Sequence, residues 1–214
     1  KQVGGVELAQ WRTIKKHPCP ERVMVNRIWR GHFGEGLVRT PDNFGKTGEA
    51  PSNPDLLDWL AIKFMDLDWS VKRLHRLIML SSTYQMSSES DPKAMAIDPD
   101  NRNFWRMNRR RLEAEAVRDS VLAVSGQLDL SPGGTMLPLK NREYVTSSGT
   151  RITNEYESPR RAVYLPVIRS ALYQQFVTFD FADPSMANGA RSTSIVAPQA
   201  LFMLNSSFVA QQSE

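Results

Sequence analysis

The 214-residue sequence has a single cysteine, Cys19, and only three histidines. One cysteine excludes an internal disulfide framework, and it excludes the CxxC metal ribbons and the CxxCH haem attachment, which need two. The histidines show no HxxxH, HxH or HExxH spacing, so the sequence predicts no metal site. Cys19 and His17 lie together in an unpatterned stretch and match none of these motifs.

Long hydrophobic runs and a strong charge of one sign are also missing. The apolar runs are far too short to cross a bilayer, so no transmembrane segment is expected. The net charge of +4 comes from 27 Lys and Arg against 23 Asp and Glu, and the two signs are interleaved. Such interleaving disfavours nucleic acid as a partner. No GxSxG nucleophile elbow is present, and the serines near residue 81 are typical of a helix end.

The most informative stretch covers residues 104–127. It begins with aromatic and basic residues, including Arg109 and Arg110, and then takes on helical spacing. One helix face carries small residues, namely Ala116, Val117, Ser120, Val121 and Val124. A second face carries Arg111, Glu115, Arg118, Asp119 and Leu122. Glu115 and Asp119 are four residues apart, which is unfavourable without a nearby cation, so this segment is expected to be the hub of a charged network.

The charged network has two interpretations. It can form a pocket for an anion or a sugar, because arginine forks bind oxyanions and carboxylates bind hydroxyls or act as acid and base. It can also be a structural lattice that locks loops to one helix, since buried charges must be paired; this second interpretation is favoured. The candidate ligand-binding residues are Arg109, Arg110, Glu113, Glu115, Arg118, Asp119, His32, Asp183 and Arg191.

Two of these candidates have simpler alternatives. His32 shares an apolar stripe with Ile28 and Trp29, which favours a core imidazole over a ligand. Asp183 and Arg191 lie in a loop between apolar segments. Loops placed in this way often carry function, but the Asp-Pro and Asn-Gly steps of this one are also ordinary turn signals.

The sequence predicts a mainly α-helical fold. Helices are expected over residues 20–33, from an Asn53 cap to about residue 65, from a Ser70 cap to about 82, in the hub, and over 199–210. Shorter helical pieces are expected near 6–14 and 170–179. The second and third helices should form an antiparallel pair beside the central hub helix. Residues 142–147 and 161–168 alternate and predict one small β hairpin. Residues 1–19 are read as the tail of a preceding segment, and 20–214 as a single domain.

Several strings occur in an order that resembles a known family. They are RVMVNRIWRGHFGEGLVRTPDNFG, PDLLDWLAIKFMDLDWSVKRLHRLIMLSSTYQ, NRNFWRMNRRRLEAEAVRDSVLAVSG, RRAVYLPV and FDFADPS followed by RSTSIVAPQALFMLN. Together they resemble the domain-of-unknown-function family 1553 over about residues 20–210. Residues 14–20, IKKHPCP, depart from the smoother lead-in of that family.

The resemblance implies a cellular location and neighbouring domains, and it implies no established activity. It implies an exported, periplasmic or cell-envelope protein of planctomycetes with several domains, often including a cytochrome c-like haem module outside this chain. No cofactor is expected in the chain itself. A role as the electron-transfer or haem partner of that module rests only on the presence of such a module in proteins of this family.

The residues and the resemblance together favour a non-catalytic binding or docking module. It would engage sister domains of the same polypeptide, or an extracellular glycan, through the Arg/Glu/Asp network. The alternative is a hydrolase or lyase acting on a polysaccharide, with Glu113 or Glu115 as an acid whose pKa is raised by burial. Geometry separates the two: catalysis needs two carboxylates that face each other across an open cleft, whereas a lattice holds each carboxylate against an arginine.

Overall fold

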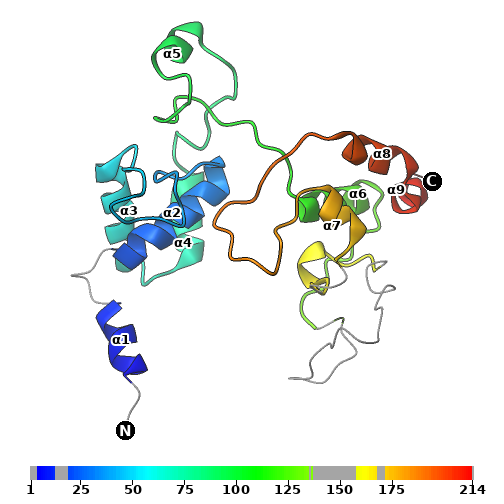
Figure 1. The fold of residues 1–214 in the computed structure, drawn as a ribbon, viewed down its shortest axis with the longest axis horizontal. Helices are drawn as coiled ribbons and strands as arrows, with labels where there is room; N and C mark the ends of the chain where they lie inside the picture. Colours follow the sequence, from blue (N-terminus) through cyan, green and yellow to red (C-terminus); the bar gives the residue numbers. More distant parts are fainter. Residues whose placement is uncertain (1–3, 13–18, 135, 137–157, 168–171, 214) are drawn as a thin grey trace. The chain divides into compact units, whose positions relative to one another are not determined.

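The structure is a computed structural model that describes residues 4–12, 19–134, 136, 158–167 and 172–213. These parts of the chain are mainly helical and contain no β-strand (Figure 1). The chain divides into two compact units, Lys1–Arg110 and Arg111–Glu214. That residues 20–214 fold as a single domain stays a prediction. None of the helices in the described ranges is long and apolar enough to cross a membrane.

Five helices lie in the described residues of the first unit. They are α1 (Gly5–Arg12), α2 (Cys19–Phe33), α3 (Pro54–Asp66), α4 (Val71–Met79) and α5 (Pro92–Ile97). The starts of α3 and α4 follow the sequence signals. The Asn53 side chain accepts a hydrogen bond from the Leu56 N–H at 3.0 Å, and Pro54 takes the first helical position. Ser70 caps α4 in the same way. These caps satisfy N–H groups that have no partner inside the helix.

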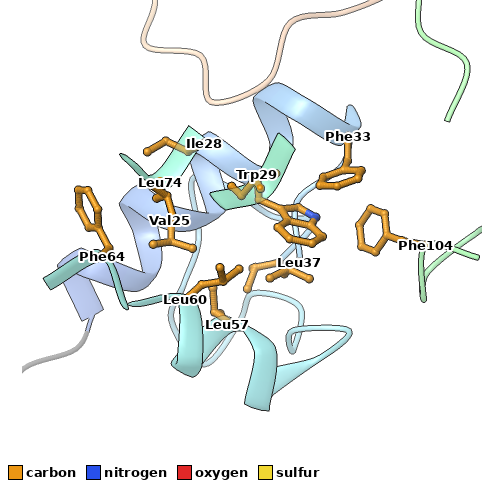
Figure 2. Packing of buried hydrophobic residues seen from close by; sticks show 12 residues of the cluster. Val25, Ile28, Trp29, Phe33, Leu37, Leu57, Leu60, Phe64, Leu74 and Phe104 are labelled. Carbon is orange, nitrogen blue, oxygen red and sulfur yellow. The ribbon is translucent and has the colours of Figure 1, made fainter. Parts of the chain in front are cut away.

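The core of the first unit forms around Trp29 of α2. Figure 2 shows its indole beside Phe33 and Leu37, with Phe104 facing it from a segment far along the chain. The Trp29 and Phe33 rings stack with centroids 4.3 Å apart, and Phe104 meets both edge-on at 5.2–5.3 Å. α3 and α4 complete this core with the buried residues Leu57, Leu60, Phe64, Leu74 and Ile78. The aromatic cluster therefore ties residues near 104 to α2.

The expected pairing of the second and third helices is not the main packing of this unit. α3 packs chiefly against α2, and its contact with α4 is smaller. α4 ends at Met79, earlier than the expected residue 82, and it buries only Leu74 and Ile78. α4 has 9 residues against 15 in α2, so it offers α3 a shorter surface to pack against.

One buried side chain fixes the long loop after α2. The Asn26 amide donates to the Val38 carbonyl at 2.9 Å and accepts from the Val38 N–H at 2.8 Å. Gly36 lies against the same amide, and a Cβ there would come within 2.5 Å of the Val38 carbonyl oxygen. This close approach requires glycine at position 36 and leads the chain from α2 to the N-cap of α3.

The structure has a short helix between residues 87 and 103, where the sequence patterns predict none. α5 begins at Pro92, and the Asp91 carboxylate accepts from the Lys93 N–H at 2.9 Å. Asp91 is thus the N-cap of α5, and Pro92 takes its first helical position. No residue of α5 is buried, so hydrophobic periodicity could not reveal this helix.

The second unit contains α6 (Ala114–Val124), a 3₁₀ turn (Ala162–Tyr164), α7 (Gln174–Thr178), α8 (Ala197–Asn205) and α9 (Ser207–Gln212). The last helix, expected to be continuous over 199–210, is broken at Ser206, which has extended backbone angles. The hub helix begins at Ala114, and the residues before it are irregular.

The predicted β hairpin is wrong for its described half. Ala162–Tyr164 form the 3₁₀ turn, and the nearest β feature in the described residues is one isolated bridge between Asp129 and Arg160. Side chains of α6 hydrogen-bond to backbone groups that a β ladder would need. Arg118 donates to the Arg160 carbonyl, and Asp119 accepts from the Ala162 N–H. Residues 142–147 lie outside the described residues.

Candidate functional site

The buried residues of the hub helix α6 are spaced four positions apart. Ala114, Arg118 and Leu122 are its buried positions, so they form a single line along the helix. The face expected to carry the charges therefore points inward. The stripe of small residues lies on the more exposed side, and Val124 is 91% exposed. Small side chains bury little apolar area, so the larger residues Arg118 and Leu122 decide which face packs.

Arg118 is fully buried and bound to backbone. Its Nη1 donates to the Arg160 carbonyl at 2.8 Å, and its Nη2 donates to the Ser158 carbonyl. The Tyr173 side chain also hydrogen-bonds to it, and the Asp119 carboxylate lies 3.6 Å from Nη1. Burial lowers the pKa of Arg118, while Tyr173 and Asp119 act in the opposite direction. The guanidinium thus serves as an internal anchor.

Asp119 completes this anchor from the neighbouring position. Its Oδ1 accepts a hydrogen bond from the Ala162 N–H at 2.7 Å. Arg118 takes two carbonyls and Asp119 takes one N–H from the same short segment, residues 158–162. Two adjacent side chains of opposite charge therefore bind both kinds of backbone group, N–H and carbonyl, and hold this segment against α6.

A second ion pair joins the start of α6 to the late loop. Arg191 makes a two-pronged contact with Glu115, from Nη1 to Oε2 at 2.6 Å and from Nη2 to Oε1 at 2.8 Å. Glu113 lies 3.1 Å from the same Nη1, and the Phe181 ring lies against the guanidinium at 5.1 Å. The hydrogen bonds to Glu115 raise the pKa of Arg191. This geometry is the strong fork of an arginine with a carboxylate.

A third cluster joins Asp180 of the late loop to Ser194 and Gln199, which the sequence did not bring together. The Asp180 carboxylate accepts from the Ser194 N–H at 2.6 Å and from its hydroxyl at 2.8 Å. The buried Gln199 amide lies 3.4 Å from that hydroxyl, and Arg111 Nη1 donates to the Ser194 carbonyl at 2.6 Å. Asp180 has φ of 60°, a left-handed conformation that aspartate tolerates better than most residues. The partners are 14 and 19 residues away, so no local pattern indicates them.

The remaining predicted site residues do not join these clusters through any described contact. Arg109 is exposed, and Arg110 donates to the Gly31 carbonyl at 2.8 Å within the first unit. Asp183 is exposed and accepts from the N–H and hydroxyl of Ser185. The predicted network is thus divided: Glu113, Glu115, Arg118, Asp119 and Arg191 contribute to the second unit, while Arg109, Arg110 and His32 belong to the first.

His32 is paired with a second histidine in the first unit. Its Nε2 lies 2.7 Å from the Nδ1 of His75 on α4, and the Tyr84 ring meets it edge-on at 5.3 Å. Burial lowers the pKa of His32, and the charges of His75 and Arg110 lower it further. In the described ranges, no group of three or more His, Cys, Asp or Glu could hold a metal ion.

The lowered pKa of His32 predicts a pH dependence of stability. The unfolded chain, with an ordinary histidine pKa near 6.5, binds more protons than the folded protein in the interval below that value. The free energy of unfolding of the first unit should therefore fall as the pH decreases from about 7 through 6.5 towards the lower folded pKa. Urea unfolding followed by tryptophan fluorescence checks this, because all five tryptophans lie in residues 1–110.

Two comparisons control that experiment. His32→Gln should flatten the dependence between pH 7 and 6. The second unit contains no histidine, so its transition should barely move in the same interval. An unchanged slope in His32→Gln would contradict the assignment.

The clusters of the second unit use their charges internally. Arg118 and Arg111 bind backbone carbonyls, and Arg191 binds carboxylates. The arrangement is that of a mainly helical unit in which ion pairs and arginine–carbonyl hydrogen bonds fix loops. A family model described as PSD1, protein of unknown function (DUF1553), matches residues 5–214, and the chain belongs to this family. No curated protein and no solved structure matches the chain.

Proposed function

We propose that this chain is a non-catalytic docking module that binds other domains of the polypeptide to which it belongs. The observation that carries this proposal is the apolar surface of α8. This helix reads APQALFMLN, yet Gln199 is its only buried residue. Leu204 is 81% exposed, Leu201 56%, and Ile195, just before the helix, 92%. Exposed apolar side chains gathered on and beside one helix are typical of a protein interface, because leaving them in water is unfavourable.

The charged clusters support docking over catalysis. Glu115 is held by Arg191, and Asp119 is held by the Ala162 N–H beside Arg118. A polysaccharide hydrolase or lyase needs two carboxylates aimed at a substrate across a cleft. The described carboxylates of α6 instead face arginines and backbone. A glycan would find Glu113, which is 65% exposed, already 3.1 Å from Arg191, so this pairing does not favour a sugar site.

The setting of the module is part of the same proposal and rests on the family resemblance. In this setting the protein is exported to the periplasm or cell envelope, and the docking partners are sister domains of the same polypeptide. A haem-bearing domain is one such partner, and it would bind through the α8 surface without placing haem in this chain.

Titration calorimetry tests the proposal. The chain should release heat and saturate when it is titrated with a separately produced remainder of its own polypeptide. The double variant Leu201→Glu/Leu204→Glu should abolish this binding, because it places two charges in the apolar contact. Both side chains are exposed, so the variant should fold.

Ile97→Glu is the matched control, since Ile97 is an 85% exposed residue in α5 of the other unit. It should bind as the unchanged chain does. Equal binding by the α8 variant, or no heat with the remainder of the polypeptide, would contradict docking through α8. Turnover of a polysaccharide by the isolated chain would support the hydrolase or lyase alternative.

A further inference from the structure

The first unit contains a cavity that the docking proposal does not use. It lies among α2, α3, α4 and the turn after α4, and its volume is about 580 Å³. This is within the range of roughly 300–1,000 Å³ that small-molecule sites occupy. All of its lining residues belong to the first unit, so the cavity does not depend on how the two units are placed.

The walls of the cavity are mostly aliphatic. They are formed by Leu56, Leu60, Leu67, Leu77, Ile78 and Leu80, together with the indoles of Trp29 and Trp59. Trp29 and Leu60 form part of the packed core in Figure 2, so one side of the cavity is rigid. Trp59 and Leu80 are 47% and 63% exposed. Such walls favour a flexible aliphatic chain, which gains free energy with each buried methylene.

The charge at the cavity has one sign. Arg73 and Arg76 line it from α4, three residues apart and therefore on neighbouring positions of the helix surface. No carboxylate is among the described residues that line it. Arg73 contacts Asp68 at 3.4 Å, but both side chains are largely exposed, and such pairs contribute little. The two guanidinium groups are placed to bind an anionic head group with forked hydrogen bonds.

We propose that this cavity binds a medium-chain fatty acid, with the aliphatic chain among the leucines and the carboxylate between Arg73 and Arg76. The apolar walls account for the chain, and the cationic pair without a carboxylate accounts for the head group. The site is separate from the α8 surface, so it stands or falls independently of the docking proposal.

Calorimetry with sodium octanoate, decanoate and dodecanoate below their micelle concentrations tests the chain. Binding should saturate at one site and become about fourfold tighter with each added methylene. The double variant Arg73→Gln/Arg76→Gln should bind decanoate about tenfold more weakly, because the charge-assisted bonds are lost. Its binding of the uncharged decanol should equal that of the unchanged chain.

Lys72→Gln is the matched control, since it removes the same charge from an exposed position of α4 that does not line the cavity. It should leave decanoate binding unchanged. The proposal is overturned if decanoate gives no saturable binding, if Lys72→Gln weakens binding as much as the arginine variant, or if the arginine variant still binds decanoate with full affinity. The last result would assign the binding to exposed apolar surface in general.

Discussion

Replacing Arg118 by alanine should destabilise the second unit by about 3–5 kcal/mol, the cost typical of breaking a buried ionic group. Arg118 is fully buried, and its loss leaves the carbonyls of Ser158 and Arg160 without their donor. It also leaves a space inside the unit that water or collapse must fill. Far-UV circular dichroism during urea unfolding, which reports helices of both units, measures the effect.

The same experiment separates the two units. Tryptophan fluorescence follows only residues 1–110, so its midpoint should stay in place in Arg118→Ala if the units unfold independently. A common shift of both signals would instead support the single domain expected over 20–214. Asp119→Ala should also lower the free energy of unfolding of the second unit. It removes the carboxylate beside Arg118 and the acceptor of the Ala162 N–H.

Arg109→Ala is the control for this series. Its side chain is exposed, so the change should stay within about 0.5 kcal/mol of the unchanged chain. The stability of Arg118→Lys should lie between those of Arg118→Ala and the unchanged chain, since an ammonium keeps the charge but does not reproduce the arginine fork. A stable Arg118→Ala protein would contradict the anchor role and would revive the interpretation of the network as a ligand pocket.

Replacing Phe33 by alanine should destabilise the first unit by about 3–5 kcal/mol. Phe33 is 1% exposed and stacks on Trp29, while Phe104 and Tyr84 meet its ring edge-on at 5.2 and 5.9 Å. Its removal therefore opens a cavity at the point where three segments of the chain meet. The midpoint of urea unfolding by tryptophan fluorescence should fall strongly.

Phe33→Leu is the control, because it keeps most of the apolar volume and should cost much less. The circular dichroism transition of the second unit should not follow Phe33→Ala if that unit is independent. A small effect of Phe33→Ala would mean that the aromatic cluster is not the centre of this core.

The parts of the fold that were predictable have local causes. The starts of α3 and α4 follow from Asn53-Pro54 and Ser70, because a cap bonds to N–H groups two or three residues away. α2 follows from its periodic apolar face. α5 and the break at Ser206 were missed, because neither changes the hydrophobic pattern.

The candidate site was predictable only as a set of residues around α6. The unfavourable stacking of Glu115 and Asp119 correctly indicated that cations must be near. It could not indicate that Arg191, 76 residues from Glu115, is one of them. The hairpin prediction failed for a related reason, since side chains of α6 bind the backbone that the alternating pattern had assigned to a strand.

The sequence by itself determined the helical class and, through the order of its motifs, the family. It also determined the starts of α3 and α4, because a cap depends on residues that are neighbours in the chain. Only the tertiary structure decided which face of α6 is buried, which charges are used internally, and which apolar side chains are left exposed on α8. A side chain contributes according to its surroundings: a guanidinium surrounded by carbonyls is an anchor, and the same group beside an apolar cavity is a binding site. Those surroundings come from segments far apart in the chain.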